Sequence, residues 1–210
     1  AWTFRNGRAT LQTQSGVCTD AYELHSAWGC LHICDYCNVL DYLNIMVNLE
    51  ELVERFSKLV SENRWLKLWK YDNHTDTITF EPEYGASRLM VELFSRQQDQ
   101  YLMMYTKSAN VDHLLSLDHR GKTIVCWSMA PATQSRLIEK GSATTSQRIE
   151  AAAKCQNAGY TVRARFSPIC LLYKSDADDD LLCVDRGGSR ILKKKRDTQN
   201  HSERLRMMHH

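Results

Sequence analysis

The segment Cys30-Leu31-His32-Ile33-Cys34-Asp35-Tyr36-Cys37 places three cysteines within eight positions, with the spacing C-x3-C-x2-C. Each thiolate is a soft, negatively charged ligand that suits zinc, copper(I) or an iron–sulfur cluster. Structural zinc sites and electron-transfer clusters usually take four protein ligands, whereas three cysteines on a four-iron cluster leave one iron open. The spacing therefore favours a metal centre that binds and activates a small molecule.

The motif resembles that of the radical S-adenosylmethionine (SAM) enzymes, in which an aromatic residue stands just before the last cysteine, here Tyr36. The resemblance implies a 4Fe-4S cluster on Cys30, Cys34 and Cys37, with the open iron bound by the amino and carboxylate groups of SAM. It implies reductive cleavage of SAM to methionine and a 5′-deoxyadenosyl radical that abstracts hydrogen from a substrate. A catalytic role for Tyr36 and an electron donor such as a flavodoxin or ferredoxin are also implied.

Other interpretations of the cysteines stay open. A zinc site completed by His25 or His32 would make the chain a non-catalytic zinc-binding module whose basic tail contacts nucleic acid or a protein partner. Buried or disulfide-linked cysteines are the third possibility. The remaining cysteines show no second cluster spacing: Cys18, Cys126, Cys155, Cys170 and Cys183. Cys126 and Cys155 fall in apolar strand and helix patterns and are predicted to be core thiols.

Composition indicates one globular domain, since the 210 residues are 43% hydrophobic and 25% charged. A net charge of +2 is too small to argue for nucleic acid by itself, and no apolar run reaches the roughly 18 residues of a membrane span. Ala1–Arg5 lacks the apolar core of a signal peptide. Eight cysteines without an export signal favour metal ligation in a reducing compartment, so we expect a cytoplasmic protein with no membrane partner.

Strands and helices are predicted to alternate along most of the chain. Alternating patterns predict strands at 20–26, 65–71, 101–106, 122–128 and 160–166. Helical spacing predicts helices at 49–60, 87–98, 111–117 and 145–158. Asn48 is a plausible N-cap of the first helix, and Gly159 closes the last. This order favours an α/β fold with a parallel sheet whose working edge lies at the carboxyl ends of the strands.

Polar residues gather after three of these strands, at 72–77, 106–112 and 127–129. Asn, Asp, Ser and Thr also favour helix caps and strand-end loops, so each cluster alone has a structural explanation. Because the strands are predicted to be parallel, the clusters and the cysteine loop would instead ring one mouth of a barrel. Together they favour a functional site.

A closer resemblance rests on Tyr105–Asp112, on Trp127–Ser128 and on the segment from Arg148 through Tyr160 to Ile169. These runs resemble spore photoproduct lyase and its radical SAM relatives over about residues 20–170. The resemblance implies a partial (β/α)6 TIM-type barrel in which Thr75, Lys107 and Ser128 contact SAM. A lysine suits the cofactor carboxylate, and two hydroxyls suit neutral hydrogen bonds to carboxylate or ribose.

The substrate is harder to predict. Five polar residues are candidates for the barrel mouth: Asn73, His74, Asp76, Arg163 and Arg165. They permit a nucleotide or another anionic molecule. Arg163 and Arg165 share one face of a strand, and they would equally suit ion pairs with Glu23 or Glu81.

Two positions depart from the lyase pattern. Asn73 stands where the lyase has a cysteine that returns a hydrogen atom to the product radical, and an amide has no weak X–H bond to give up. Asn38 stands where the lyase has a tyrosine. We therefore expect a relative that shares the cofactor chemistry, with DNA as only one candidate substrate.

The resemblance stops at Leu171, and charge blocks follow at 176–180 and 193–196. We predict an irregular lead-in at 1–19, the radical SAM barrel at 20–170 and a charged, disordered tail at 171–210. The family barrel needs a further strand and helix, so the barrel is expected to be incomplete at its C-terminus. The basic run would alternatively contact phosphate.

Overall fold

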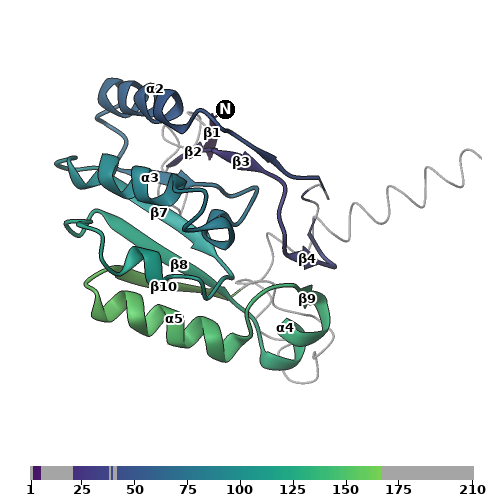
Figure 1. The fold of residues 1–210 in the computed structure, drawn as a ribbon. Helices are drawn as coiled ribbons and strands as arrows, with labels where there is room; N and C mark the ends of the chain where they lie inside the picture. The colour runs from purple at the N-terminus through teal and green to yellow at the C-terminus, as the bar shows by residue number, and fades with distance from the viewer. Residues whose placement is uncertain (1, 6–20, 38, 40–41, 167–210) are drawn as a thin grey trace, which may run out of the picture. The chain divides into compact units, whose positions relative to one another are not determined.

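A computed structural model describes residues 2–5, 21–37, 39 and 42–166, and its core is a six-stranded sheet of order β1-β2-β6-β7-β8-β10 (Figure 1). The strands are β1 Trp2–Arg5, β2 Ala21–Leu24, β6 Leu68–Tyr71, β7 Tyr101–Thr106, β8 Thr123–Met129 and β10 Thr161–Phe166. β1 pairs antiparallel with β2 at the edge, and the other neighbours are parallel. The predicted α/β fold with five parallel strands is confirmed.

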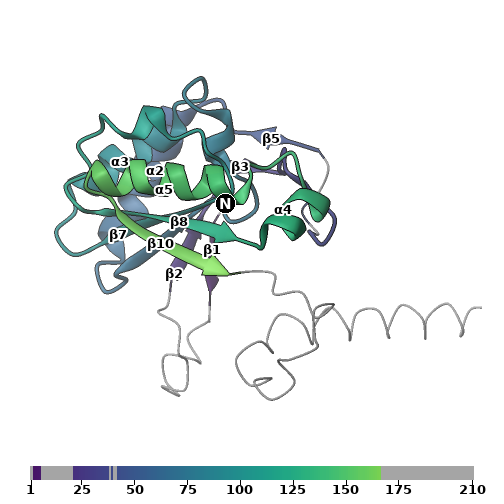
Figure 2. The ribbon, with the colours of Figure 1, turned by 90° about the horizontal axis from the view of Figure 1, so that it is seen from below.

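Helices α2, α3 and α5 lie on one face of this sheet (Figure 2). The helices are α2 Leu49–Glu62, α3 Ala86–Ser95, α4 Ala132–Ile138 and α5 Thr145–Asn157, with 3-10 turns η1 Thr77–Phe80 and η2 Asp112–Leu114. Alternate strand residues point toward the helices, and Trp69, Leu102 and Trp127 are fully buried there. The opposite side of the strands carries Met103 and Cys126, which belong to a separate small apolar cluster.

Helix ends follow local sequence signals in part. Thr144 and Gln147 form a capping box at the start of α5, and Gly159 after its end has φ +91°, a conformation that favours glycine. Asn48 occupies the N-cap position of α2, but its side chain caps no backbone group and instead donates to Glu51 Oε2 at 2.7 Å. Asn48 therefore stands at the predicted N-cap position, but its side chain does not cap the helix.

Several elements differ from the predicted ones. Residues 111–117 form only the single 3-10 turn η2, and Trp2–Arg5, expected to be irregular, form β1. Four two-residue strands were not predicted: β3 Ala27–Trp28, β4 Ile33–Cys34, β5 Asn44–Ile45 and, directly after α4, β9 Glu139–Lys140. β3 pairs with β5 and β4 with β9, both antiparallel. Two-residue strands carry no periodicity, so only their partners define them.

Cys126 and Cys155 are buried free thiols, as predicted, with 5% and 0% of their surface exposed. The other three scattered cysteines, the tail at 171–210 and most of the lead-in lie outside the described residues. Within the described part of the chain, no helix is long and apolar enough to cross a membrane.

Candidate active site

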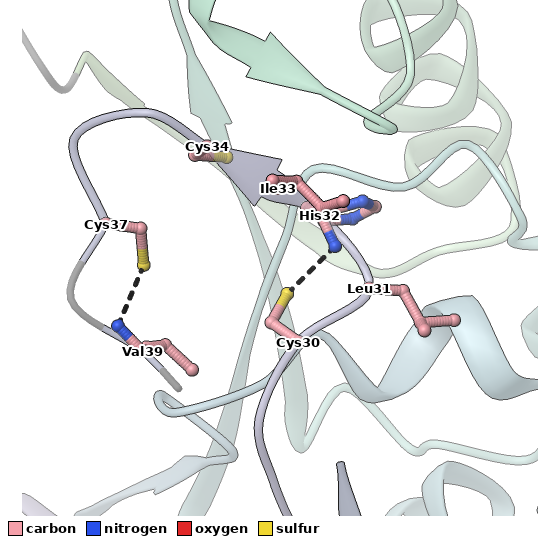
Figure 3. A pocket seen from close by; sticks show the side chains of 7 residues that line it. All are labelled: Cys30, Leu31, His32, Ile33, Cys34, Cys37 and Val39. Atoms are coloured by element: carbon pink, nitrogen blue, oxygen red, sulfur yellow. Dashed lines mark hydrogen bonds between the residues drawn. The ribbon is translucent and has the colours of Figure 1, made fainter. Parts of the chain in front are cut away.

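The three motif cysteines line one cavity of about 330 Å³ (Figure 3). Its lining consists of Cys30, Leu31, His32, Ile33, Cys34, Cys37 and Val39. Cys34 is buried, Cys30 is partly buried and Cys37 is exposed, and all three are free thiols. The disulfide interpretation is therefore wrong for these cysteines. Among the described residues, no three His, Cys, Asp or Glu side chains are grouped to hold a single metal ion.

The donor set of this cavity fits a cationic cluster. Burial raises the pKa of the Cys30 thiol to about 11, and burial also raises the pKa of Cys34 although the Lys107 ammonium opposes the shift. The thiols of Cys30 and Cys34 are therefore protonated near neutral pH until a cation stabilises the thiolate form. Three thiols around one cavity match the three protein ligands of a cluster with an open iron.

Close backbone packing shapes the cysteine loop. Gly29 has φ +93°, and a Cβ there would lie 2.0 Å from the carbonyl oxygen of Tyr42, so only glycine fits. The Asp35 N–H donates to the Ile138 carbonyl at 2.9 Å beside the β4–β9 pairing, in which Cys34 faces Glu139. The loop is thus bound to the segment after β8.

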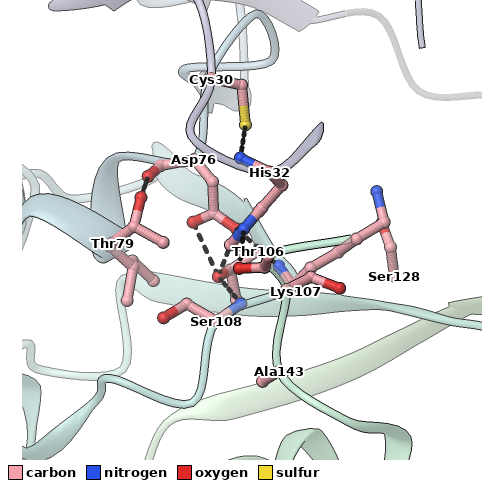
Figure 4. A network of polar contacts seen from close by, with 12 residues as sticks. Cys30, His32, Asp76, Thr79, Thr106, Lys107, Ser108, Ser128 and Ala143 are labelled. Carbon is pink, nitrogen blue, oxygen red and sulfur yellow. Dashed lines mark hydrogen bonds and ion pairs between the residues drawn. The ribbon is translucent and has the colours of Figure 1, made fainter. Parts of the chain in front are cut away.

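Asp76 joins the cysteine loop to the ends of β6 and β7 (Figure 4). Its Oδ2 accepts from His32 Nε2 at 2.9 Å and from the Lys107 N–H at 2.7 Å, and the Thr106 hydroxyl donates to Oδ1 at 2.8 Å. His32 Nδ1 lies 2.9 Å from the carbonyl oxygen of Gly141. Two of the predicted polar clusters and the cysteine loop therefore meet, as expected.

The three predicted SAM contacts stand in different surroundings. Thr75 is buried, and its hydroxyl has no hydrogen-bond partner among the described residues. Lys107 keeps 20% of its side chain exposed, and Ser128 is half-buried near Lys107 (Figure 4). A buried polar group without a partner costs free energy, so the Thr75 hydroxyl fits a bound polar ligand.

Buried Glu139 and Arg148 form a chain of contacts with the half-buried Tyr36, and sequence reasoning missed this link. The Tyr36 hydroxyl donates to Glu139 Oε1 at 2.5 Å, and Arg148 Nη2 donates to Glu139 Oε2 at 2.6 Å. Burial, together with the bond to Glu139, raises the pKa of Tyr36, so the hydroxyl stays protonated. A signal was present: Arg148 shares a helix face with buried Ala151 and Cys155, at spacings of three and seven.

Known proteins resemble this chain in sequence. Residues 6–195 match the sequence profile of spore photoproduct lyase. The chain belongs to the spore photoproduct lyase family. The lyases of Bacillus subtilis (strain 168) and of Geobacillus sp. (strain Y412MC61) are 28% and 26% identical to it over 170 residues, or 77% of this chain. The matches cover 49% and 50% of those relatives, so the chain spans about half their length.

Solved structures of spore photoproduct lyase share the fold. One variant, solved with bound AdoMet (SAM) and dinucleoside spore photoproduct, matches with a TM-score of 0.66 and 25% identity. The match covers 70% of this chain and 46% of that one. Spore photoproduct lyases are radical SAM enzymes with a 4Fe-4S cluster, built on a partial TIM barrel. These relatives do not favour the zinc-module alternative, and His32 uses both ring nitrogens on Gly141 and Asp76.

The predicted substrate residues of this family member separate into two groups. Asn73 is exposed, as are Arg163 and Arg165 on β10, with the Arg165 guanidinium 6.0 Å from the centroid of the Tyr105 ring. His74 packs edge-on against Trp28, with ring centroids 4.4 Å apart, and burial lowers the pKa of its imidazole.

Asp76 differs, because both its oxygens bind protein groups and it serves as a structural hub. Glu23 accepts from Lys70 at 2.7 Å, while Glu81 accepts from the backbone at the start of α3. These contacts do not support the alternative in which the two carboxylates serve Arg163 and Arg165.

Proposed function

We propose that this chain cleaves SAM reductively on a 4Fe-4S cluster and abstracts hydrogen from a substrate. The observation that carries the proposal is the single cavity lined by Cys30, Cys34 and Cys37 beside strand ends that Asp76 ties together. These thiols would hold the cluster. When bound, the cluster and SAM supply the electron transfer and the 5′-deoxyadenosyl radical.

The protein groups position the cofactor. Lys107 would bind the SAM carboxylate, because its ammonium lies near the thiol loop and keeps part of its surface exposed. The Thr75 hydroxyl, buried without a partner among the described residues, would gain a hydrogen bond from SAM, and Ser128 would give a second one. Tyr36 would act as a catalytic group next to the cluster.

The substrate would enter past Asn73, His74 and the exposed arginines of β10. A DNA photoproduct is a candidate because the relatives include a lyase solved with dinucleoside spore photoproduct. The amide of Asn73 disfavours a reaction that needs a hydrogen atom returned from this position. The reaction also needs an electron donor, such as a flavodoxin or ferredoxin in the cytoplasm.

The test is anaerobic reconstitution with iron and sulfide, followed by reduction and an assay for 5′-deoxyadenosine. We expect four-iron absorbance and release of 5′-deoxyadenosine, both lost or strongly reduced in Cys34→Ala. Cys126→Ala is the matched control, since this thiol is buried away from the motif, and it should retain the cluster. A wild-type chain that binds one zinc and develops no four-iron absorbance would refute the proposal.

An oligonucleotide that carries a spore photoproduct then tests the substrate. Repair to thymines would make the chain a lyase despite Asn73. SAM cleavage without repair would support a different substrate.

A further inference from the structure

Glu139 stands where three parts of the site meet. It is fully buried, and each carboxylate oxygen has its own partner, Arg148 Nη2 on Oε2 and the Tyr36 hydroxyl on Oε1. Lys107 Nζ lies 3.9 Å from Oε1, which is too long for a hydrogen bond but close enough for electrostatic attraction. One carboxylate thus links a buried cation, the tyrosine of the cysteine motif and the lysine at the end of β7.

Arg148 fixes this carboxylate in place. Its guanidinium is fully buried, and Nε and Nη1 donate to the carbonyl oxygens of Ala143 and Ser128 at 2.8 and 2.7 Å. A guanidinium stays charged and presents its donors in a rigid planar fork. The paired cation therefore holds the Glu139 carboxylate oriented toward Tyr36 and Lys107.

Lys107 is attracted to the Glu139 carboxylate but forms no hydrogen bond with it. Both oxygens of Glu139 already accept strong hydrogen bonds, and the Tyr36 ring, whose centroid lies 5.6 Å from Nζ, adds a weak cation–π attraction. No N–H of the ammonium is used in a hydrogen bond to a described residue. The ammonium is thus held in position with donors available for an added anion.

We propose that Glu139 is a positioning residue that, fixed by Arg148, aims Lys107 at the carboxylate of SAM and holds Tyr36 beside the thiol loop. The inference rests on the proposed function, in which Lys107 receives that carboxylate. The Tyr36 hydroxyl has a defined part in it, because its hydrogen bond to Oε1 competes with Lys107 for that oxygen and so weakens the pull of Glu139 on the lysine. Without the hydroxyl, Lys107 would pair with Oε1 and compete poorly for an anion.

The test is the dissociation constant of SAM for the anaerobically reconstituted protein, measured by equilibrium dialysis without reductant so that no cleavage occurs. Glu139→Gln removes the attraction, and Tyr36→Phe frees Oε1, so each should weaken SAM binding by about tenfold, the equivalent of one lost hydrogen bond to a charged group. Glu150→Gln, an exposed glutamate on α5, is the matched control and should bind like the wild type.

A second comparison separates positioning from a general structural effect. In the double variant Tyr36→Phe with Glu139→Gln, no carboxylate remains to capture Lys107, so SAM binding should be no weaker than in Glu139→Gln alone. Iron content and thermal midpoint of Tyr36→Phe should match the wild type. If Glu139→Gln fails to fold because Arg148 is left unpaired, Tyr36→Phe alone decides, since it keeps the buried ion pair.

Wild-type affinity in Tyr36→Phe, or in a folded Glu139→Gln, would overturn the inference and leave the proposed function intact. Losses of SAM affinity that add up in the double variant would also overturn the inference. Capture of Lys107 by Glu139 predicts instead that Tyr36→Phe has no further effect once the carboxylate is gone. If the wild-type protein forms its cluster but binds no SAM, the proposed function itself fails.

Discussion

The helix-covered face of the sheet and the cysteine-loop side are stabilised by different interactions. On the helix face, large apolar side chains such as Trp69, Phe94 and Trp127 are fully buried. On the loop side, Asp76 and Glu139 connect segments through charged hydrogen bonds. Apolar burial is non-directional, whereas charged hydrogen bonds require fixed geometry. The first face therefore sets stability, and the second sets the geometry of the site.

Trp127→Ala should have the largest effect on stability. The side chain is fully buried, and its indole N–H donates to the Ser108 carbonyl at 3.0 Å. The lost packing and cavity should lower the free energy of unfolding by about 3–5 kcal/mol. Urea unfolding followed by tryptophan fluorescence and circular dichroism would measure it. A loss below about 1 kcal/mol would contradict the view that this face holds the fold.

Asp76→Asn should affect the site more than the fold. The amide cannot accept from His32, Thr106 and the Lys107 N–H as the carboxylate does, so the free energy of unfolding should fall by about 1–3 kcal/mol. The cysteine loop loses its tie to β7, and the iron content after reconstitution should fall as well. Full iron content in a destabilised variant would show that Asp76 serves the fold alone.

Acid should destabilise the helix-covered side through His113, whose Nε2 lies 3.1 Å from Ser87 Oγ. Burial lowers the pKa of this imidazole below 6.5, although Glu81 and Asp112 oppose the shift. Below pH 6.5 the unfolded chain binds more protons than the folded one, so stability is full above this pH and falls as the pH drops through the lowered pKa. Unfolding curves at pH 7.5 and 5.5 should differ less for His113→Gln than for the wild type. If stability changes between the two pH values as much in His113→Gln as in the wild type, His113 is not a source of the acid destabilisation.

Asp35→Asn should have the smallest effect, although it lies within the cysteine motif. Its carboxylate pairs with Lys140 at 2.9 Å, but both side chains are about half exposed. Exposed ion pairs contribute about 0–1 kcal/mol because water screens them. Thermal midpoint and iron content should stay near the wild-type values. A marked loss of iron would mean that this surface contact, and not only the buried network, orders the loop.

The sheet and its main helices were predictable because their signals are local. Alternation marked β7 and β8 to within one residue at each end, and helical spacing marked α2 and α5 to within two. The 111–117 helix was overpredicted, because only Asp112–Leu114 closes as a 3-10 turn. The strands and helices that were predicted correctly are buried periodically against a large apolar partner, and this burial produces the pattern in the sequence.

The sequence by itself determined the thiol motif and the α/β order with its parallel sheet, since spacing and periodicity lie within short stretches, and the resemblance of those stretches indicated the family. Only the tertiary structure decided the network around the site, because its partners are far apart in the chain. His32 meets Asp76 across 44 positions, and Tyr36 meets Glu139 across 103. Periodicity in the sequence does not identify the distant partner of a side chain that forms a charged hydrogen bond. The fold must bring the two together before either can be assigned a role.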